Sequence, residues 1–224
     1  NEMRREALDK LLQKRSEPAP LATKEITLPE YAEHEVGMIP QLAARFETAT
    51  QLPGAEYLAK LRYLILPIRE ADAVPQPLRC KTLLELPRAA FGTVEPDTMR
   101  RLAALEGSGF AGVVANNLAQ FGYASPLPVF GGLGLNVTNP MSAAEYVCLG
   151  ARGLLVQPET ALTAMRAVAP RQKDGTPVPT AALCYGHLPL MLTRACPLRN
   201  VRTSCAGCTH KGKLRDRKGR DFSV

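Results

Sequence analysis

Three cysteines lie close together near the end of the chain, at Cys196, Cys205 and Cys208. The last two form a CAGC pair, in which Gly207 allows a tight turn so that both thiolates face one metal centre. Three thiolates carried by loops are typical ligands of an iron–sulfur cluster, with zinc as the alternative. Both centres usually take a fourth ligand. The local candidates are Cys184, His187 and His210.

Basic side chains surround these thiols. Residues 194–220 carry nine Lys or Arg against one acidic residue, Asp216, which is a local net charge of +8. Residues 1–193 hold 19 basic and 19 acidic residues, so the basic character is local. A local patch of this kind predicts binding of a polyanion such as RNA, although a solvated basic tail has the same composition. The candidate RNA contacts are Arg194, Arg199, Arg202, Lys211, Lys213 and Arg215.

Composition and the absence of certain motifs narrow the classes of protein to which the chain can belong. The 224 residues suffice for a core without disulfides, so clustered cysteines predict metal binding in a reducing, cytoplasmic compartment. No apolar run approaches the roughly 18 residues of a membrane span, so no membrane partner is expected. The sequence also lacks a Walker-type glycine loop, a GxSxG elbow and an HExxH motif.

The elements that position these residues alternate after about residue 40. Apolar, β-prone runs are followed by helical patterns, which predicts an α/β fold of repeated βαβ units forming a partial or complete (β/α) barrel-like domain. The expected strand runs are 42–52, 63–68, 81–87, 111–117, 132–139, 153–159 and 180–186. Helices are expected at 3–15, 96–109, 139–151 and 158–168, the third with Ser142 as its N-cap and Glu145 completing a capping box.

The domain plan follows from these patterns. Residues 1–15 are expected to form a helix that ends a preceding domain, and 16–40 a linker. Residues 41–192 form the barrel-like domain, and 193–224 an irregular, cysteine-rich basic segment.

Polar residues stand where several predicted strands end. Since the carboxyl ends of parallel strands share one edge of a sheet, these residues are candidates for a substrate pocket. The alternative is that Asn139 and Glu159 only cap the helices that follow. The catalytic candidates are Asn136, Asn139, Glu159 and Tyr185.

Several stretches resemble the collagenase-like peptidases of family U32. They are YGHLPLMLTRACPL at 185–198, LNVTNPMSAAEYVCLGARGLLVQPE at 135–159, LRDRKGRDFSV at 214–224 and NEMRREALDKL at 1–11. The resemblance covers nearly the whole chain and is most specific over 110–224. It implies the C-terminal section of a longer protein whose catalytic region resembles a (β/α) barrel.

The resemblance also implies possible activities. Some members are named for peptidase activity. Others install 5-hydroxycytidine in 23S ribosomal RNA or 5-hydroxyuridine in transfer RNA, and further relatives hold a four-cysteine, four-iron cluster. In those relatives the first two cysteines lie in a G-x-L-C-x6-C frame. Gly186, Leu188 and Cys196 fit that frame, while Pro189 stands at the first cysteine position.

Three functions are therefore compared. The preferred one is an iron–sulfur-dependent RNA hydroxylation enzyme, in which the cysteines bind iron and the basic residues bind RNA. The second is a collagenase-like, metal-assisted peptidase using Glu159 and His187. The third is a non-catalytic, zinc-stabilised RNA-binding module with His210 as the fourth ligand.

Overall fold

The computed structural model describes residues 2–17, 39–123, 127–193, 195–200, 206, 208–209 and 211–223. The chain divides into two units, residues 1–30 and 31–224. The expected linker at 16–40 lies almost entirely outside the described residues.

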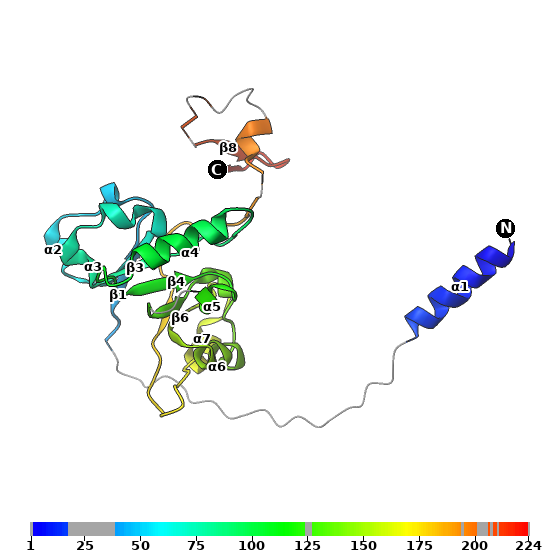
Figure 1. The fold of residues 1–224 in the computed structure, drawn as a ribbon, viewed down its shortest axis with the longest axis horizontal. Helices are drawn as coiled ribbons and strands as arrows, with labels where there is room; N and C mark the ends of the chain where they lie inside the picture. Colours follow the sequence, from blue (N-terminus) through cyan, green and yellow to red (C-terminus); the bar gives the residue numbers. More distant parts are fainter. Residues whose placement is uncertain are drawn as a thin grey trace. The chain divides into compact units, whose positions relative to one another are not determined.

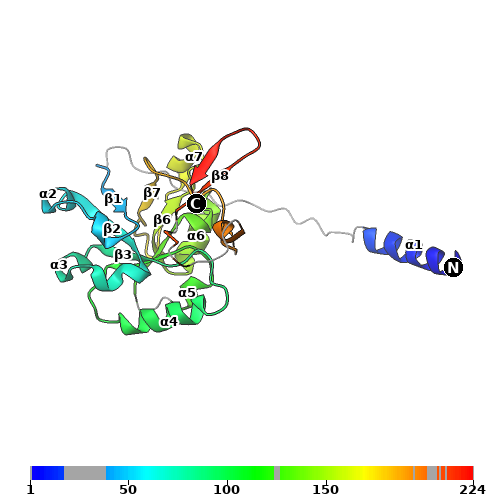
Figure 2. The same ribbon diagram turned by 90° about the horizontal axis from the view of Figure 1, so that it is seen from above.

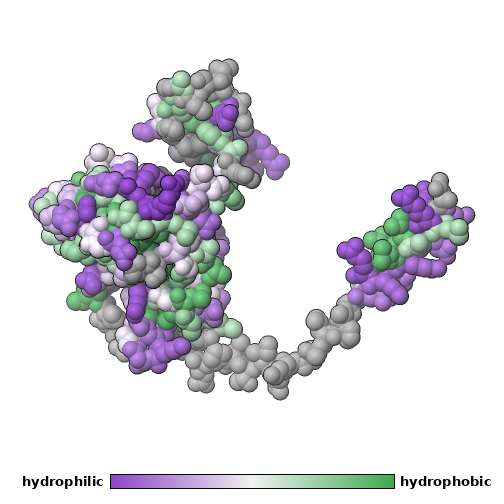
Figure 3. All heavy atoms as spheres, in the orientation of Figure 1, coloured by the Kyte–Doolittle hydropathy of each residue, from purple (hydrophilic) through white to green (hydrophobic). Residues whose placement is uncertain are grey.

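The first unit contains the helix α1 (Glu2–Ser16), which begins and ends close to the predicted positions. Its apolar side chains are all solvent-exposed and gather along one side, seen in green in Figure 3. They are Met3, Leu8, Leu11 and Leu12. Among the described residues, no helix combines the length and the apolar character needed to cross a membrane.

The second unit is built on a seven-stranded parallel sheet, which confirms the predicted α/β class. The strands pair in sequence order, each parallel to the next, and the sheet curls as part of a barrel (Figures 1 and 2). They are β1 (Leu42–Arg45), β2 (Leu61–Pro67), β3 (Thr82–Glu85), β4 (Gly112–Ala115), β5 (Val129–Gly131), β6 (Ala151–Val156) and β7 (Thr180–Ala182).

Short helices and turns connect these strands, and several lie on the outside of the curled sheet in Figure 2. The α-helices are α2 (Ala55–Leu58), α3 (Gln76–Arg79), α4 (Val94–Ala104), α5 (Gln120–Tyr123), α6 (Pro140–Cys148) and α7 (Leu162–Ala167). The 3-10 turns are η1 (Ala49–Gln51), η2 (Ile68–Ala73) and η3 (Leu133–Leu135).

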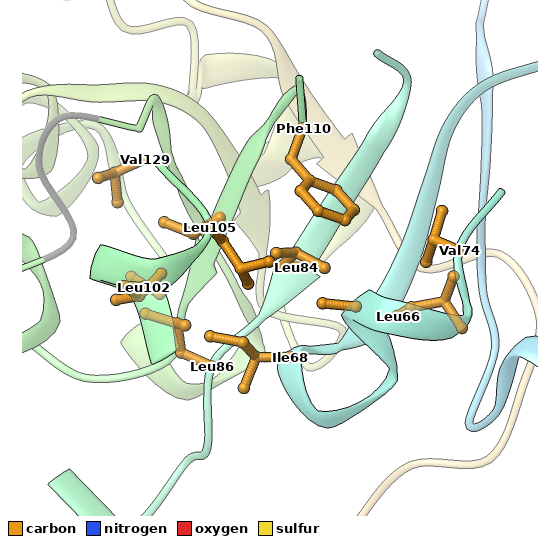
Figure 4. Packing of buried hydrophobic residues seen from close by; sticks show 12 residues of the cluster. Leu66, Ile68, Val74, Leu84, Leu86, Leu102, Leu105, Phe110 and Val129 are labelled. Atoms are coloured by element: carbon orange, nitrogen blue, oxygen red, sulfur yellow. The ribbon is translucent and has the colours of Figure 1, made fainter. Parts of the chain in front are cut away.

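Two clusters of buried residues hold the sheet to these helices. In the first, Leu102 of α4 and Leu105 pack with Leu66 of β2 and Leu84 of β3, as Figure 4 shows. The second cluster lies under α6 and includes Leu154 of β6. Burying a Leu or Val side chain stabilises a fold by about 1.5–3 kcal/mol. These clusters therefore fix the positions of the strand ends that carry the candidate site.

The predicted strand at 132–139 is wrong. The fifth strand lies earlier, at β5, and η3 follows it. Residues 132–139 contribute only an isolated bridge between Val137 and Val156. The physical reason is close packing by glycine: a Cβ at Gly134 would stand 2.1 Å from the Asn116 carbonyl oxygen. At Gly134 the chain therefore forms the turn η3 against Asn116 and does not continue as an extended strand.

The predicted N-cap of α6 is also wrong. Asn139, not Ser142, occupies the cap, and its Oδ1 accepts a hydrogen bond from the Ser142 amide at 2.9 Å. Pro140 takes the first helical position, where a missing N–H costs no hydrogen bond.

Part of the C-terminal segment is regular, contrary to the prediction. It contains the 3-10 turn η4 (Pro197–Asn200) and an antiparallel hairpin of β8 (Lys213–Arg215) and β9 (Asp221–Ser223). A Cβ on Gly212 would lie 2.2 Å from Leu198 Cδ2, so a larger residue at position 212 would have to displace this buried leucine side chain.

Candidate functional site

An arginine held by two carboxylates marks the carboxyl edge of the sheet. Arg45 is the last residue of β1, and its Nε donates to Glu85 Oε2 at 2.7 Å. Glu85 ends β3, two strands away. The Arg45 Nη1 group donates to Glu47 Oε2 at 3.0 Å. The backbone pairing of three parallel strands thus brings these charges to one edge of the sheet.

A second arginine joins this network from η2. Arg69 Nη2 forms an ion pair with Glu47 Oε1 and donates to the Glu47 carbonyl oxygen at 3.3 Å. Its neighbour Glu70 accepts from the Ala49 amide at 2.9 Å. These contacts fasten the loop after β1 to the loop after β2.

The ion pairs shift two pKa values. Burial disfavours the charge on Arg45, but Glu85 and Glu47 outweigh it and raise the pKa of Arg45 above its ordinary value. Burial likewise opposes ionisation of Glu47. Hydrogen bonds from Arg69 and Arg45 prevail, so the pKa of Glu47 lies below its ordinary value. Arg45 and Glu47 are therefore both charged near neutral pH.

Buried amides support the network from behind. Asn116 follows β4, and its Nδ2 donates to the Leu86 carbonyl at 3.1 Å and to Glu85 Oε1 at 3.4 Å. Its Oδ1 accepts from the Gly134 amide at 3.1 Å. Asn116 thereby fixes Glu85 from the side opposite Arg45 and joins β3, β4 and the turn after β5.

Gln120 secures the same corner. Its Oε1 accepts from the Asn116 and Asn117 amides at 2.6 and 3.2 Å, and its Nε2 donates to the Pro87 carbonyl at 2.7 Å. Gln120 is fully buried, so these bonds satisfy an amide that would otherwise be costly to bury. Asn116 and Gln120 are positioning residues.

A second polar group lies where β6 ends. Asn136 Oδ1 accepts from Gln157 Nε2 at 2.9 Å, and Asn136 adopts a left-handed backbone with φ of 52°. Gln157 Oε1 and Thr160 Oγ1 are buried without a hydrogen-bond partner in the described part of the chain. Buried polar atoms in this condition are normally satisfied by a water molecule or a ligand. Non-glycine residues in this backbone region occur preferentially at functional sites.

Together these groups can bind and orient a polar substrate. The Arg45 and Arg69 side chains are 49% and 60% exposed, so both can reach an anionic group in solution. Because Glu47 and Glu85 neutralise them, the edge offers directed hydrogen bonds more than a strong positive potential. Asn136 and Gln157 add neutral donors and acceptors along the same edge.

The four predicted catalytic residues occupy different surroundings. Asn136 belongs to the group just described, and Asn139 caps α6. Glu159 is exposed in the turn after β6, and Tyr185 is 96% exposed beyond β7. No hydrogen bond in the described structure joins two of these four side chains. Their catalytic role stays a prediction.

The predicted metal ligands are described only in part. Cys184 and Cys196 are exposed, and Cys208 is half-buried. Cys205 and His210 lie outside the described residues. Within the described ranges, no group of three His, Cys, Asp or Glu side chains is placed to hold a metal ion. The thiols of these cysteines are the donor type that binds iron–sulfur clusters or zinc.

The predicted RNA contacts are also described only in part. Arg194 and Arg202 lie outside the described residues, while Arg199 and Lys211 are exposed. Lys213 and Arg215 flank Asp221: Arg215 Nε donates to Asp221 Oδ1 at 2.7 Å, and Lys213 Nζ stands 3.9 Å from Oδ2.

Sequence reasoning missed the ionic part of the carboxyl edge. Arg45 and Glu85 lie inside the predicted runs 42–52 and 81–87, and only the structure shows that β1 and β3 end at these residues. The signal in the sequence is a charged residue that interrupts each apolar run. The Glu47–Arg69 pair joins two loops 22 residues apart and gives no local signal.

Comparisons with known proteins give a distant likeness. No protein-family model matches the chain. No curated protein sequence matches it either. A solved structure titled as that of the U32 peptidase Mk0906 is similar over 62% of this chain and 71% of its own, with 13% identity and a TM-score of 0.43. A likeness of this degree carries no argument about activity.

Proposed function

We propose that this chain is the C-terminal part of a U32-like protein and that it serves iron–sulfur-dependent hydroxylation of ribosomal or transfer RNA. The observation that carries the proposal is the coincidence of three cysteines with a net charge of +8 within residues 194–220. Thiolates suit an iron–sulfur cluster, and a local cationic surface suits a polynucleotide. The sequence resemblance to U32 relatives that hydroxylate RNA supports the same assignment.

In this proposal Cys196, Cys205 and Cys208 hold the cluster, and Cys184 or His210 is the fourth ligand. A bound cluster would supply one-electron redox chemistry. The basic residues of the segment bind RNA phosphates.

The carboxyl edge of the sheet has the second role in the proposal. Arg45, held between Glu85 and Glu47, binds an anionic group of the substrate or co-substrate. Asn136 and Gln157 supply neutral hydrogen bonds of the kind that recognise a base edge. The Asn116 side chain keeps Glu85, and through it Arg45, in position.

Nucleoside analysis tests the proposed activity. Total RNA is prepared from host cells that express the wild-type chain or the Cys205→Ala/Cys208→Ala variant. The RNA is digested to nucleosides, and their masses are compared by mass spectrometry. We expect a pyrimidine nucleoside heavier by one oxygen atom with the wild-type chain and its loss with the variant. Cys80→Ala/Cys148→Ala is the matched control, since both cysteines are exposed and lie outside the basic segment.

Two outcomes would contradict this function. Identical nucleoside profiles with all three chains would remove the hydroxylation assignment. Hydrolysis of casein or collagen by purified chain, lost in Glu159→Gln, would instead favour the peptidase.

A further inference from the structure

The hairpin of β8 and β9 is closed by a rigid, basic turn. Asp216 Oδ1 accepts from the amides of Lys218 and Arg220, both at 2.8 Å, and the Asp216 amide donates to the Arg220 carbonyl at 2.9 Å. Gly219 has φ of 79°, the left-handed conformation that completes hairpin turns of this kind. The backbone of the turn is therefore fixed before any partner binds.

The turn carries three exposed cations, Arg217, Lys218 and Arg220. None of them forms an ion pair within the residues that the structure describes, whereas Lys213 and Arg215 on β8 share Asp221. A phosphate approaching the turn need not displace a carboxylate, so these three side chains offer the less hindered charge. In Figure 3 this end of the segment is hydrophilic.

An apolar pair lies on the opposite face of the same hairpin. Leu214 and Phe222 stand directly opposite each other in the register and remain 38% and 39% exposed. Alternation along the strands places them away from Lys213, Arg215 and Asp221. An exposed aromatic ring beside a cationic turn provides a surface on which an unpaired base can stack.

We infer that the β8–β9 hairpin binds single-stranded RNA, with Arg217, Lys218 and Arg220 contacting successive phosphates and Phe222 stacking on a base. The inference rests on the proposed RNA function and makes it more specific. A duplex buries its base faces, so the stacking contact selects unpaired strands. Charge alone would not make that distinction.

The test measures binding of the full chain to a mixed-sequence RNA oligonucleotide, single-stranded and as a duplex, over a series of salt concentrations. Arg217→Gln/Lys218→Gln/Arg220→Gln is expected to bind the single strand about tenfold or more weakly. Its salt dependence should be shallower by about 2 in log–log slope, as expected for three lost contacts. The control Arg100→Gln/Arg166→Gln/Lys173→Gln removes equal charge from exposed sites in the α/β unit and should bind like wild type.

Phe222→Leu tests the stacking contact, because it keeps the apolar pair with Leu214 and removes the ring. We expect about a fivefold loss for the single strand and no change for the duplex. Thermal unfolding of each variant checks that it remains folded.

The outcomes separate this inference from the proposed function. If wild type binds no RNA, the proposed function fails. If wild type binds RNA but the turn variant binds equally well, or if both triple variants lose equal affinity, only the hairpin assignment fails. Equal affinity for duplex and single strand, unaffected by Phe222→Leu, overturns the single-strand selection. Tighter binding to anionic phospholipid vesicles than to RNA would make the partner a membrane surface and overturn the inference.

Discussion

At the residue scale, Asn116 links the strand ends to the candidate site. Both ends of its amide are used, toward Glu85 and Leu86 on one side and toward Gly134 on the other. This close approach requires glycines in the turn that follows β5, where a Cβ on Gly132 would lie 2.5 Å from Asn116 Oδ1. Asn116 therefore connects that turn to Glu85 and, through Glu85, to Arg45.

Gly134→Ala should disturb this corner. The added Cβ would meet the Asn116 carbonyl, and overpacking of this kind typically costs about 1–3 kcal/mol. Urea unfolding should show a lower midpoint for this variant. Gly122→Ala is the matched control, because a Cβ there meets nothing within 4 Å. Equal stability of Gly134→Ala and wild type would show that Asn116 is not packed as described.

The lowered pKa of Glu47 should make the stability of the fold depend on pH. Its folded-state pKa is lowered, so the ion pairs stabilise the fold above the unfolded value, near 4.5, and this contribution disappears as pH falls through the folded value. Because Glu47 is half exposed, the contribution is less than about 1 kcal/mol. Unfolding measured between pH 7 and about pH 3 should show a smaller acid loss for Glu47→Gln. Superimposable pH profiles would rule out the Glu47 ion pairs as a source of stability.

At the element scale, the N-cap of α6 allows a structural role of Asn139 to be distinguished from a catalytic one. Asn139 caps the helix through the Ser142 amide. Asn139→Ala should cost about 1 kcal/mol of stability, while Asn139→Ser should retain most of it, since serine caps well. Comparison of the two by thermal unfolding tests the cap. If Asn139→Ser is stable yet loses RNA modification, the residue also serves the site; if it unfolds as readily as the alanine variant, the cap assignment is wrong.

Much of the element plan could be predicted because six of the seven strands lie in apolar runs, with clear helical patterns between some of them. The fifth was misplaced because GGLGLNV has a strand-like composition but is packed by its glycines against Asn116. A close contact between two backbone segments, as at Gly134 and Asn116, leaves no mark on the hydrophobic pattern of the sequence. Asn136 could be selected by its position in that run, whereas Glu47 and Arg69 meet only through the fold.

At the scale of the whole molecule, the net positive charge is concentrated near the C-terminal end of the sequence. Residues 1–193 are neutral in sum, and residues 194–220 carry +8 together with three of the six cysteines. The α/β unit offers an ordered polar edge, and the C-terminal segment offers thiols and cations. The proposed function requires both, with RNA held by the segment and oriented by the edge.

Measuring iron and acid-labile sulfide in the anaerobically purified chain tests the proposed cluster most directly. Visible absorption is recorded for the same protein and for the Cys205→Ala/Cys208→Ala variant. We expect bound iron with sulfide and a brown colour in the wild-type chain and in Cys80→Ala/Cys148→Ala. We expect both to be lost in Cys205→Ala/Cys208→Ala. Zinc alone would contradict the proposed cluster and make the segment a structural module. Iron retained by the Cys205→Ala/Cys208→Ala variant would contradict the assignment of these thiols as ligands.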